Sequence, residues 1–197
     1  MAPFNLSLLL VLITFSVVSD SFPTGAPISA CQTMMPGHIG VFPQPGPAPY
    51  IIKINSSSYQ TGKPIQVQIL GPAYRGLLLE CRTFTQTTLF GQWLEPPNNT
   101  KILPCPENPV GAITHSNTNF KDQATTYIWM PTNSSCTNVL FFIATVAESF
   151  DVYWLGIRSA VIYNAQSAEV CSTSSATSQQ AVVYLLMCFQ IVLILVF

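Results

Sequence analysis

The residues best suited to chemistry are two histidines, His38 and His115, together with Met34 and Met35 beside the first of them. Imidazole nitrogens and thioether sulfurs bind soft or borderline metals, so this set predicts a metal site at His38 and His115. The alternative is that each imidazole hydrogen-bonds to the backbone in a region with few strands. Two histidines also fall short of the three or four protein ligands that a firm zinc site needs.

Enzymatic catalysis is not predicted. The chain has no G-x-S-x-G nucleophile motif and no glycine-rich phosphate loop. Its eight acidic residues show no pairing that suggests general acid–base work, and cysteines paired as disulfides supply no thiolate. We therefore expect no enzyme activity and no cofactor.

The charge balance and the N-terminus indicate a secreted protein. Seven Lys and Arg residues form no run and the net charge is −1, so nucleic acid is not an expected partner. Residues 4–18 form an apolar block that is followed by the small residue Ser19. This pattern predicts a secretory signal peptide over residues 1–21, with an uncleaved signal anchor as the alternative.

The C-terminus combines a polar spacer, residues 167–180, with a hydrophobic tail, residues 181–197. The tail is shorter than the roughly 20 residues of a spanning helix, and no Lys or Arg follows it. Small residues, a polar spacer and a terminal apolar tail are the layout of a glycosylphosphatidylinositol (GPI) anchor signal. The candidate attachment sites are Ser172, Ser174 and Ser175. A short transmembrane helix remains the alternative, so we expect a protein that is held at the outer face of the plasma membrane through its tail, or secreted.

Two of the six cysteines lie at the C-terminal end, Cys171 in the first part of the spacer and Cys188 in the tail. The other four lie in the domain and allow three pairings: Cys31, Cys81, Cys105 and Cys136. In an oxidising compartment they are expected to form disulfides. Glycosylation sequons in polar, turn-like stretches begin at Asn55, Asn98 and Asn133.

The elements that must position these residues are mostly strands. Residues 22–49 contain seven prolines, which argues against a helix or a central strand and favours an extended segment wrapped over the domain. From Tyr50 onward, short segments rich in β-branched and aromatic residues alternate with turn residues. They predict an all-β fold, an immunoglobulin-like antiparallel β-sandwich of about seven to eight strands. Trp93, beside Gly91 and a proline pair, is expected to be partly exposed.

Several sequence pieces resemble the reeler domain. They are C-Q-T-M-M-P-G-H at 31–38, F-G-Q-W at 90–93, A-I-T-H-S-N at 112–117, W-M-P at 129–131 and Y-W at 153–154. The resemblance covers most of a domain spanning residues 22–166. It implies a disulfide between Cys31 and Cys105, which draws the two histidine-bearing segments together. Cys81 and Cys136 then remain either as a second pair, which departs from the family pattern, or as two buried thiols.

Reeler domains occur at the N-terminus of reelin, in ferric-chelate reductase-like membrane proteins, and alone in small secreted defence-type proteins. The resemblance therefore implies an extracellular recognition module without catalysis. Its partners would be microbial surface molecules or glycans in a defence role, or an extracellular protein in matrix or receptor contact. The alternative is a metal- or haem-handling accessory protein. Ferric reduction itself is not expected, because the multi-helix cytochrome module of the reductases is absent from this sequence.

Overall fold

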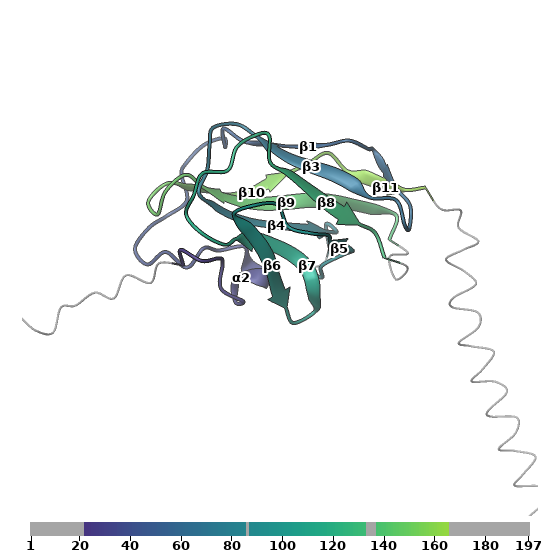
Figure 1. Ribbon diagram of the computed structural model, residues 1–197, viewed down its shortest axis with the longest axis horizontal. Coiled ribbons are helices and arrows are strands. Elements are labelled where there is room, and N and C mark those ends of the chain that lie inside the picture. The colour runs from purple at the N-terminus through teal and green to yellow at the C-terminus, as the bar shows by residue number, and fades with distance from the viewer. Residues whose placement is uncertain (1–21, 86, 133–136, 166–197) are drawn as a thin grey trace, which may run out of the picture.

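Two facing β-sheets form most of the computed structural model, which describes residues 22–85, 87–132 and 137–165 (Figure 1). The smaller sheet has the strand order β1-β3-β8-β5. Its strands are β1 (Ile51–Ile54), β3 (Ile65–Leu70), β8 (Thr126–Met130) and β5 (Gln92–Trp93). All its neighbouring strands are antiparallel.

The larger sheet has the order β2-β11-β9-β4-β7-β6, and β10 pairs separately with β9. Its strands are β2 (Ser58–Tyr59), β11 (Ile162–Asn164), β9 (Val139–Ala147), β4 (Gly76–Arg82), β7 (Asn108–His115), β6 (Thr100–Cys105) and β10 (Tyr153–Arg158). Only the short β2–β11 pair is parallel. The prediction of an all-β sandwich is therefore confirmed.

The main core fills the space between the sheets. Strand β3 alternates buried and more exposed residues, as expected for a strand with one covered face. Its buried residues pack against a group of rings that make edge-to-face or tilted contacts, including Trp129, Phe142 and Trp93. Trp93 is only 3% exposed and donates its indole N–H to the Gly111 carbonyl, so the prediction of a partly exposed Trp93 was wrong.

A second, smaller core lies on the outer face of the larger sheet. Strands β4 and β9 are buried along nearly their whole length, because one face meets the main core and the other is covered by the N-terminal arm, residues 22–49. Leu78, Phe141 and Ile143 meet Ala30 and Met34 of the arm in this second core. This double burial explains the continuous apolar runs of the two strands.

The arm wraps over the domain as predicted, but it is not free of helix. A single turn, α2 (Ala30–Thr33), lies between Pro27 and Pro36 and ends at Met34 in the left-handed conformation. Prolines flank this turn and do not interrupt it, so the expectation of no helix fails only over these four residues. The helix carries Cys31, which forms a disulfide with Cys105 at the end of β6, as the resemblance implied.

The described residues form eleven strands, more than the seven or eight expected. The sequence pattern missed β2, which has only two residues, and β6, which contains Pro104. Proline is tolerated in β6 because it is an edge strand, and the register shifts between Leu103 and Cys105. The apolar stretch from Val152 to Tyr163 forms two strands, β10 and β11, because strand pairing breaks between Arg158 and Ile162.

The second predicted disulfide differs from the structure. Cys81 is a free thiol that is completely buried in the main core, and burial raises its pKa well above the usual value. The alternative of a buried thiol therefore holds for Cys81, whereas Cys136 lies outside the described residues. The signal peptide, the spacer with Ser172, Ser174 and Ser175, and the hydrophobic tail also lie outside them. Among the described residues, no helix has the length and apolar character needed to span a bilayer.

Candidate functional site

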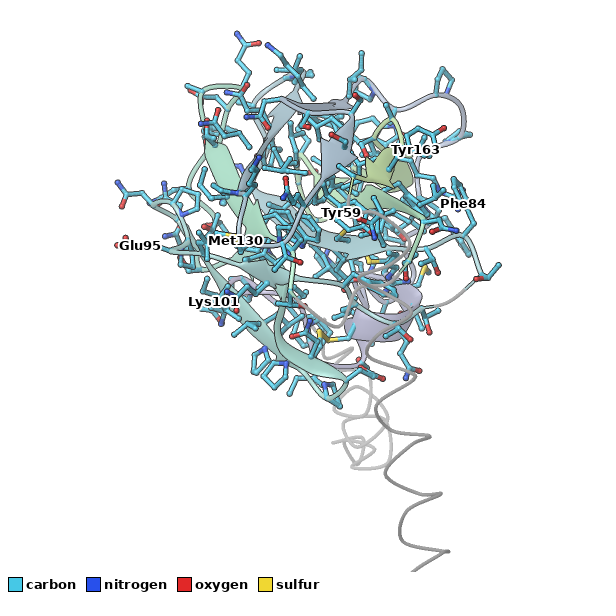
Figure 2. All side chains as sticks on the ribbon, turned by 90° about the vertical axis from the view of Figure 1, so that its right-hand side faces the viewer. Tyr59, Phe84, Glu95, Lys101, Met130 and Tyr163 are labelled. Atoms are coloured by element: carbon cyan, nitrogen blue, oxygen red, sulfur yellow. A yellow bond between two sulfur atoms is a disulfide. The ribbon has the colours of Figure 1, made fainter. Side chains whose placement is uncertain are left out.

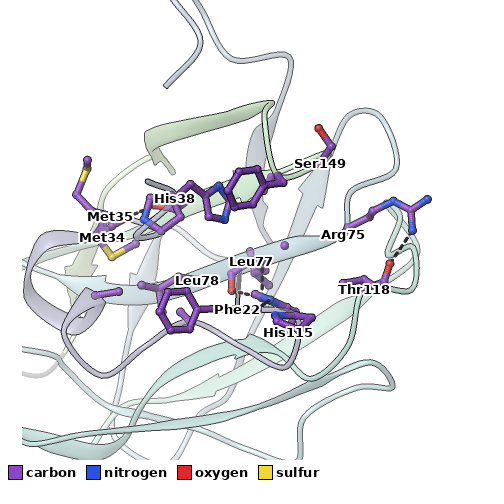
Figure 3. A pocket seen from close by; sticks show the side chains of 18 residues that line it. Phe22, Met34, Met35, His38, Arg75, Leu77, Leu78, His115, Thr118 and Ser149 are labelled. Carbon is purple, nitrogen blue, oxygen red and sulfur yellow. Dashed lines mark hydrogen bonds between the residues drawn. The ribbon is translucent and has the colours of Figure 1, made fainter. Parts of the chain in front are cut away.

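A pocket of about 130 Å³ lies between the N-terminal arm and the end of the larger sheet. Its floor is formed where β4 begins, at Gly76 to Leu78, and where β9 and β7 end, at Ala147 and His115. Figure 3 shows Phe22 and His38 on opposite sides of the opening, with Met34 and Met35 at one end and Arg75 at the other. Most of its lining is apolar, and the only polar side chains among the described residues that line it are basic, imidazole or hydroxyl groups.

His115 acts as a clamp between the arm and the sheet. Its Nε2 donates to the Phe22 carbonyl at 2.8 Å, and because a carbonyl can only accept, this nitrogen carries the proton. Nδ1 then accepts from the backbone N–H of Leu77 at 3.2 Å. Burial lowers the pKa of His115; its backbone hydrogen bonds oppose the shift, and Lys121 and Lys101 add to it. The imidazole is therefore neutral, with both nitrogens engaged.

Thr114 completes this clamp beside the histidine. Its hydroxyl donates to the Leu77 carbonyl at 2.6 Å and accepts from the Ala26 N–H at 2.9 Å. Gly37 of the arm is required on the other side, because its φ is +67° and a β-carbon there would lie 3.1 Å from the Phe22 ring. The motifs containing the two histidines therefore build the pocket wall.

His38 lies on the arm above the pocket. Its ring stacks on Phe150 at a centroid distance of 4.4 Å and meets Tyr153 edge-on. Burial lowers its pKa, while the Phe150 backbone and Asp151 act in the opposite direction. Its Nδ1 is covered and has no hydrogen-bond partner within the described ranges.

The structure thus brings both predicted metal ligands, His38 and His115, to one pocket, with Met34 and Met35 in its lining. The described part of the chain contains no group of three or more His, Cys, Asp or Glu side chains that could hold a metal ion. A metal bound through Nδ1 of His115 would displace the Leu77 N–H, and one bound through Nε2 would require this nitrogen to lose its proton and its hydrogen bond to Phe22. Metal binding by the pair stays a prediction.

The sequence did not indicate the pocket's cation, Arg75. One of its terminal nitrogens donates to the Thr118 carbonyl at 2.9 Å, and its guanidinium lies 3.9 Å from the centroid of the Phe120 ring. Behind it, Lys121 is 2% exposed and donates to three backbone carbonyls, those of Arg75, Asn117 and Asn119. Burial lowers the pKa of Lys121 to about 8, and Arg75 adds to the shift. The turn sequence before β4 gives no pattern that marks Arg75 as a pocket residue.

A buried ion pair holds α2 against the larger sheet. Arg82 binds the completely buried Glu80 through Nε at 2.7 Å and donates to the backbone carbonyls of Cys31 and Gln32. Burial raises the pKa of Glu80 to about 7, although Arg82 opposes the shift. Thr145 adds a further hydrogen bond to the Met34 carbonyl at 2.6 Å. The arm that closes the pocket is thus fixed by a disulfide and by polar contacts from three strands.

Two predicted glycosylation sites, Asn55 and Asn98, are exposed and lie in connections between strands, so each has room for a glycan. The third, Asn133, lies outside the described residues. Figure 2 shows Glu95 and Lys101 on one side of the domain and the exposed Phe84 and Tyr163 on the other. None of these four side chains lines the pocket.

The family model of the Reeler domain matches residues 29–170, which is most of the chain. The chain belongs to the reeler family. Solved structures agree on the fold: a human F-spondin reeler domain has a TM-score of 0.51 at 14% identity, covering 68% of this chain and 99% of that one.

Two kinds of reeler relatives differ in how much of their length is matched. "Putative defense protein 3" of Antheraea mylitta is 34% identical over 74% of this chain and 88% of that protein. "Putative defense protein Hdd11-like" of Samia ricini is 36% identical over 74% and 89%. "Ferric-chelate reductase 1" of Bos taurus is 28% identical over 81% of this chain but only 27% of its own length. This chain therefore shares one module with the reductase, and nearly the whole length of the defence proteins.

Proposed function

We propose that this reeler protein is a non-catalytic recognition module that works outside the cell, in defence against microbes, and binds microbial surface molecules. The observation that carries the proposal is the match over about nine-tenths of the length of proteins named for defence. The described residues support the absence of catalysis, since the only pocket that has two histidines uses one of them, His115, as a structural clamp.

The direction of the strands favours one end of the sandwich as the binding end. Strand β9 begins beside β11, the last strand before the C-terminal spacer, and ends at Ala147 in the pocket. Its nine residues separate these ends by roughly 27 Å at about 3.4 Å per residue. If the tail is a membrane anchor, the pocket lies at the end of the domain that points away from the membrane.

Binding to microbial cells tests the function. The purified, glycosylated protein is labelled and mixed with killed Gram-negative bacteria, Gram-positive bacteria, yeast and animal cells, and the bound fraction is measured after sedimentation. We expect saturable binding to at least one microbial class that exceeds binding to animal cells. Equal, non-saturable binding to all four would refute the proposal.

Two matched variants locate the binding end. Ser149→Trp places a bulky side chain at the exposed rim of the pocket, and Tyr163→Ser removes an exposed ring from β11 at the opposite end. We expect the first variant to lose binding and the second to retain it. The reverse result would place recognition at the β11 end.

Surface attachment is tested separately on intact animal cells that express the full chain. Treatment with phosphatidylinositol-specific phospholipase C is expected to release a glycosylated product, as a GPI anchor at Ser172, Ser174 or Ser175 requires. Retention of the protein on treated cells would indicate a spanning tail, and its presence in the untreated medium would indicate secretion.

The second candidate function is metal or haem handling, which is favoured by the presence of His38 and His115 in one pocket. Calorimetry of the purified protein with Cu²⁺, Zn²⁺ and haem tests it directly. Stoichiometric binding that His38→Ala abolishes, with the melting temperature little changed, would support this function, because His115→Ala also removes the clamp between the arm and the sheet. Absence of binding by the parent protein would end it.

A further inference from the structure

The pocket has the size of a small organic molecule. Its volume of about 130 Å³ is close to the roughly 150 Å³ of apolar cavities that accommodate one benzene ring. Its walls offer an aromatic ring from Phe22 and the imidazole of His38, with methionine side chains at one end (Figure 3). Polarizable methionine and flat rings make favourable contacts with an aromatic or short aliphatic group.

Arg75 is the only Lys, Arg, Asp or Glu among the described residues that line this apolar space, and Asp151 acts on His38 from its edge. Arg75 lines the pocket, and its hydrogen bond to Thr118 and its stacking on Phe120 hold the guanidinium in place. Lys121 and Lys101 act on His115 as further positive charges. None of the pocket-lining residues in the described ranges is acidic. A cation fixed before binding loses little entropy when an anion arrives.

We propose that this pocket binds a small organic anion with one aromatic ring or a short branched chain as its apolar body. The body fills the space between Phe22 and His38, and the carboxylate or an equivalent anionic group pairs with Arg75. This inference deepens the proposed recognition function and rests on it, since it names the ligand class of the same pocket. A polar neutral sugar fits less well, because most of the lining offers no hydrogen-bond partner.

The test uses the purified protein and two probes of the same ring and similar size, 4-fluorobenzoate, which carries an anionic carboxylate, and 4-fluorobenzyl alcohol, which carries a neutral hydroxymethyl group at the same position. Ligand-observed fluorine NMR measures the dissociation constant of each probe. We expect the acid to bind at least tenfold more tightly than the alcohol, because a hydrogen-bonded charge pair contributes more than a neutral contact. If the parent protein does not bind the acid, or binds both probes with equal affinity, the proposal is overturned before any variant is made.

Substitutions then test whether Arg75 supplies the positive charge that binds the acid. Arg75→Gln is expected to weaken acid binding about tenfold and to leave alcohol binding unchanged, while Arg75→Lys retains most of the acid affinity. The matched control is Arg158→Gln, because Arg158 also lies over an aromatic ring, that of Phe141, but does not line the pocket. An equal loss in Arg75→Gln and Arg158→Gln overturns the assignment. Ser149→Trp is expected to abolish binding of both probes, and unchanged binding by this variant places the probe elsewhere.

The two proposals can fail independently. If the protein binds microbial cells but not 4-fluorobenzoate, the recognition function stands and the ligand class is wrong. If it binds the acid through Arg75 but no microbial cell, the ligand class stands and the defence function is wrong.

Discussion

The buried Glu80 makes the stability of the domain depend on pH in a direction that can be stated in advance. The folded carboxyl has a pKa of about 7 because it is completely buried, whereas the unfolded side chain titrates near 4.5. Between these values the native state holds a proton that the unfolded state has lost. The Glu80 contribution is therefore fully present below pH 4.5, and it is lost as the pH rises through 7.

The magnitude follows from the two pKa values. The difference between 4.5 and about 7, at 1.36 kcal/mol for each pH unit, gives about 3 kcal/mol. His38 and His115, whose pKa values burial lowers, act in the opposite direction below about pH 6.5 and would obscure the effect in the parent protein alone. Glu80→Gln keeps the shape of the side chain and removes only its titration, so the difference between the two proteins isolates Glu80.

The assay is urea unfolding of both proteins at several pH values from 4.5 to 8, with the disulfide intact. We expect the parent protein to lose about 3 kcal/mol relative to Glu80→Gln over this range. Glu107→Gln is the control for the direction of the pH dependence. Glu107 is exposed, and its hydrogen bond from Gln32 lowers its pKa, which is the opposite shift to that of Glu80. A flat difference between the two proteins, or a parent that gains stability relative to Glu80→Gln with rising pH, would show that Arg82 keeps Glu80 ionised throughout and would refute the reasoning.

Three further predictions concern the architecture. Replacement of both disulfide cysteines by serine is expected to lower the free energy of unfolding by about 4 kcal/mol, because the bridge closes a loop with a sequence separation of 74; unchanged urea midpoints would contradict it. Gly91→Ala is expected to lower the melting temperature far more than Gly156→Ala. Both glycines have φ near +66°, so the backbone strain is similar. A β-carbon at Gly91 would lie 2.4 Å from the Trp129 ring, whereas one at Gly156 would meet nothing within 4 Å. Cys81 is expected to react with a maleimide only after denaturation, as mass spectrometry of a peptide digest can show, whereas a disulfide at Cys81 would block labelling even then.

The sequence predicted the two sheets better than it predicted how the N-terminal arm packs on the larger one. Alternation in β3 and the β-branched and aromatic segments were enough for an all-β sandwich. The continuous apolar run of β4 could not reveal by itself that Leu77 and Leu79 face the main core while Leu78 faces the arm. A two-residue strand and an edge strand containing proline carry too little pattern for detection, and for this reason β2 and β6 were missed.

The pocket was harder to predict than the strands because its residues come from distant segments whose contact depends on packing. Two of its members, His38 and His115, were found because their chemistry is distinctive, but the chemistry expected of them was metal binding. What the geometry shows for His115 is a hydrogen-bonding pattern, Nε2–H to Phe22 and Nδ1 from Leu77, that no spacing of residues encodes. The alternative noted from the sequence, an imidazole bonded to backbone, describes His115 correctly.

The arm links the stability of this domain to its proposed recognition site. The wall that carries Phe22 and Met34 stays in place through His115, Thr145 and the disulfide, and without those contacts the pocket would be an open sheet face. An open apolar face binds molecules with little discrimination, whereas a closed pocket with one fixed cation selects by size and charge. If the proposed recognition function holds, the proline-rich arm contributes specificity as well as burial, which would be a physical reason for its several attachments to the larger sheet.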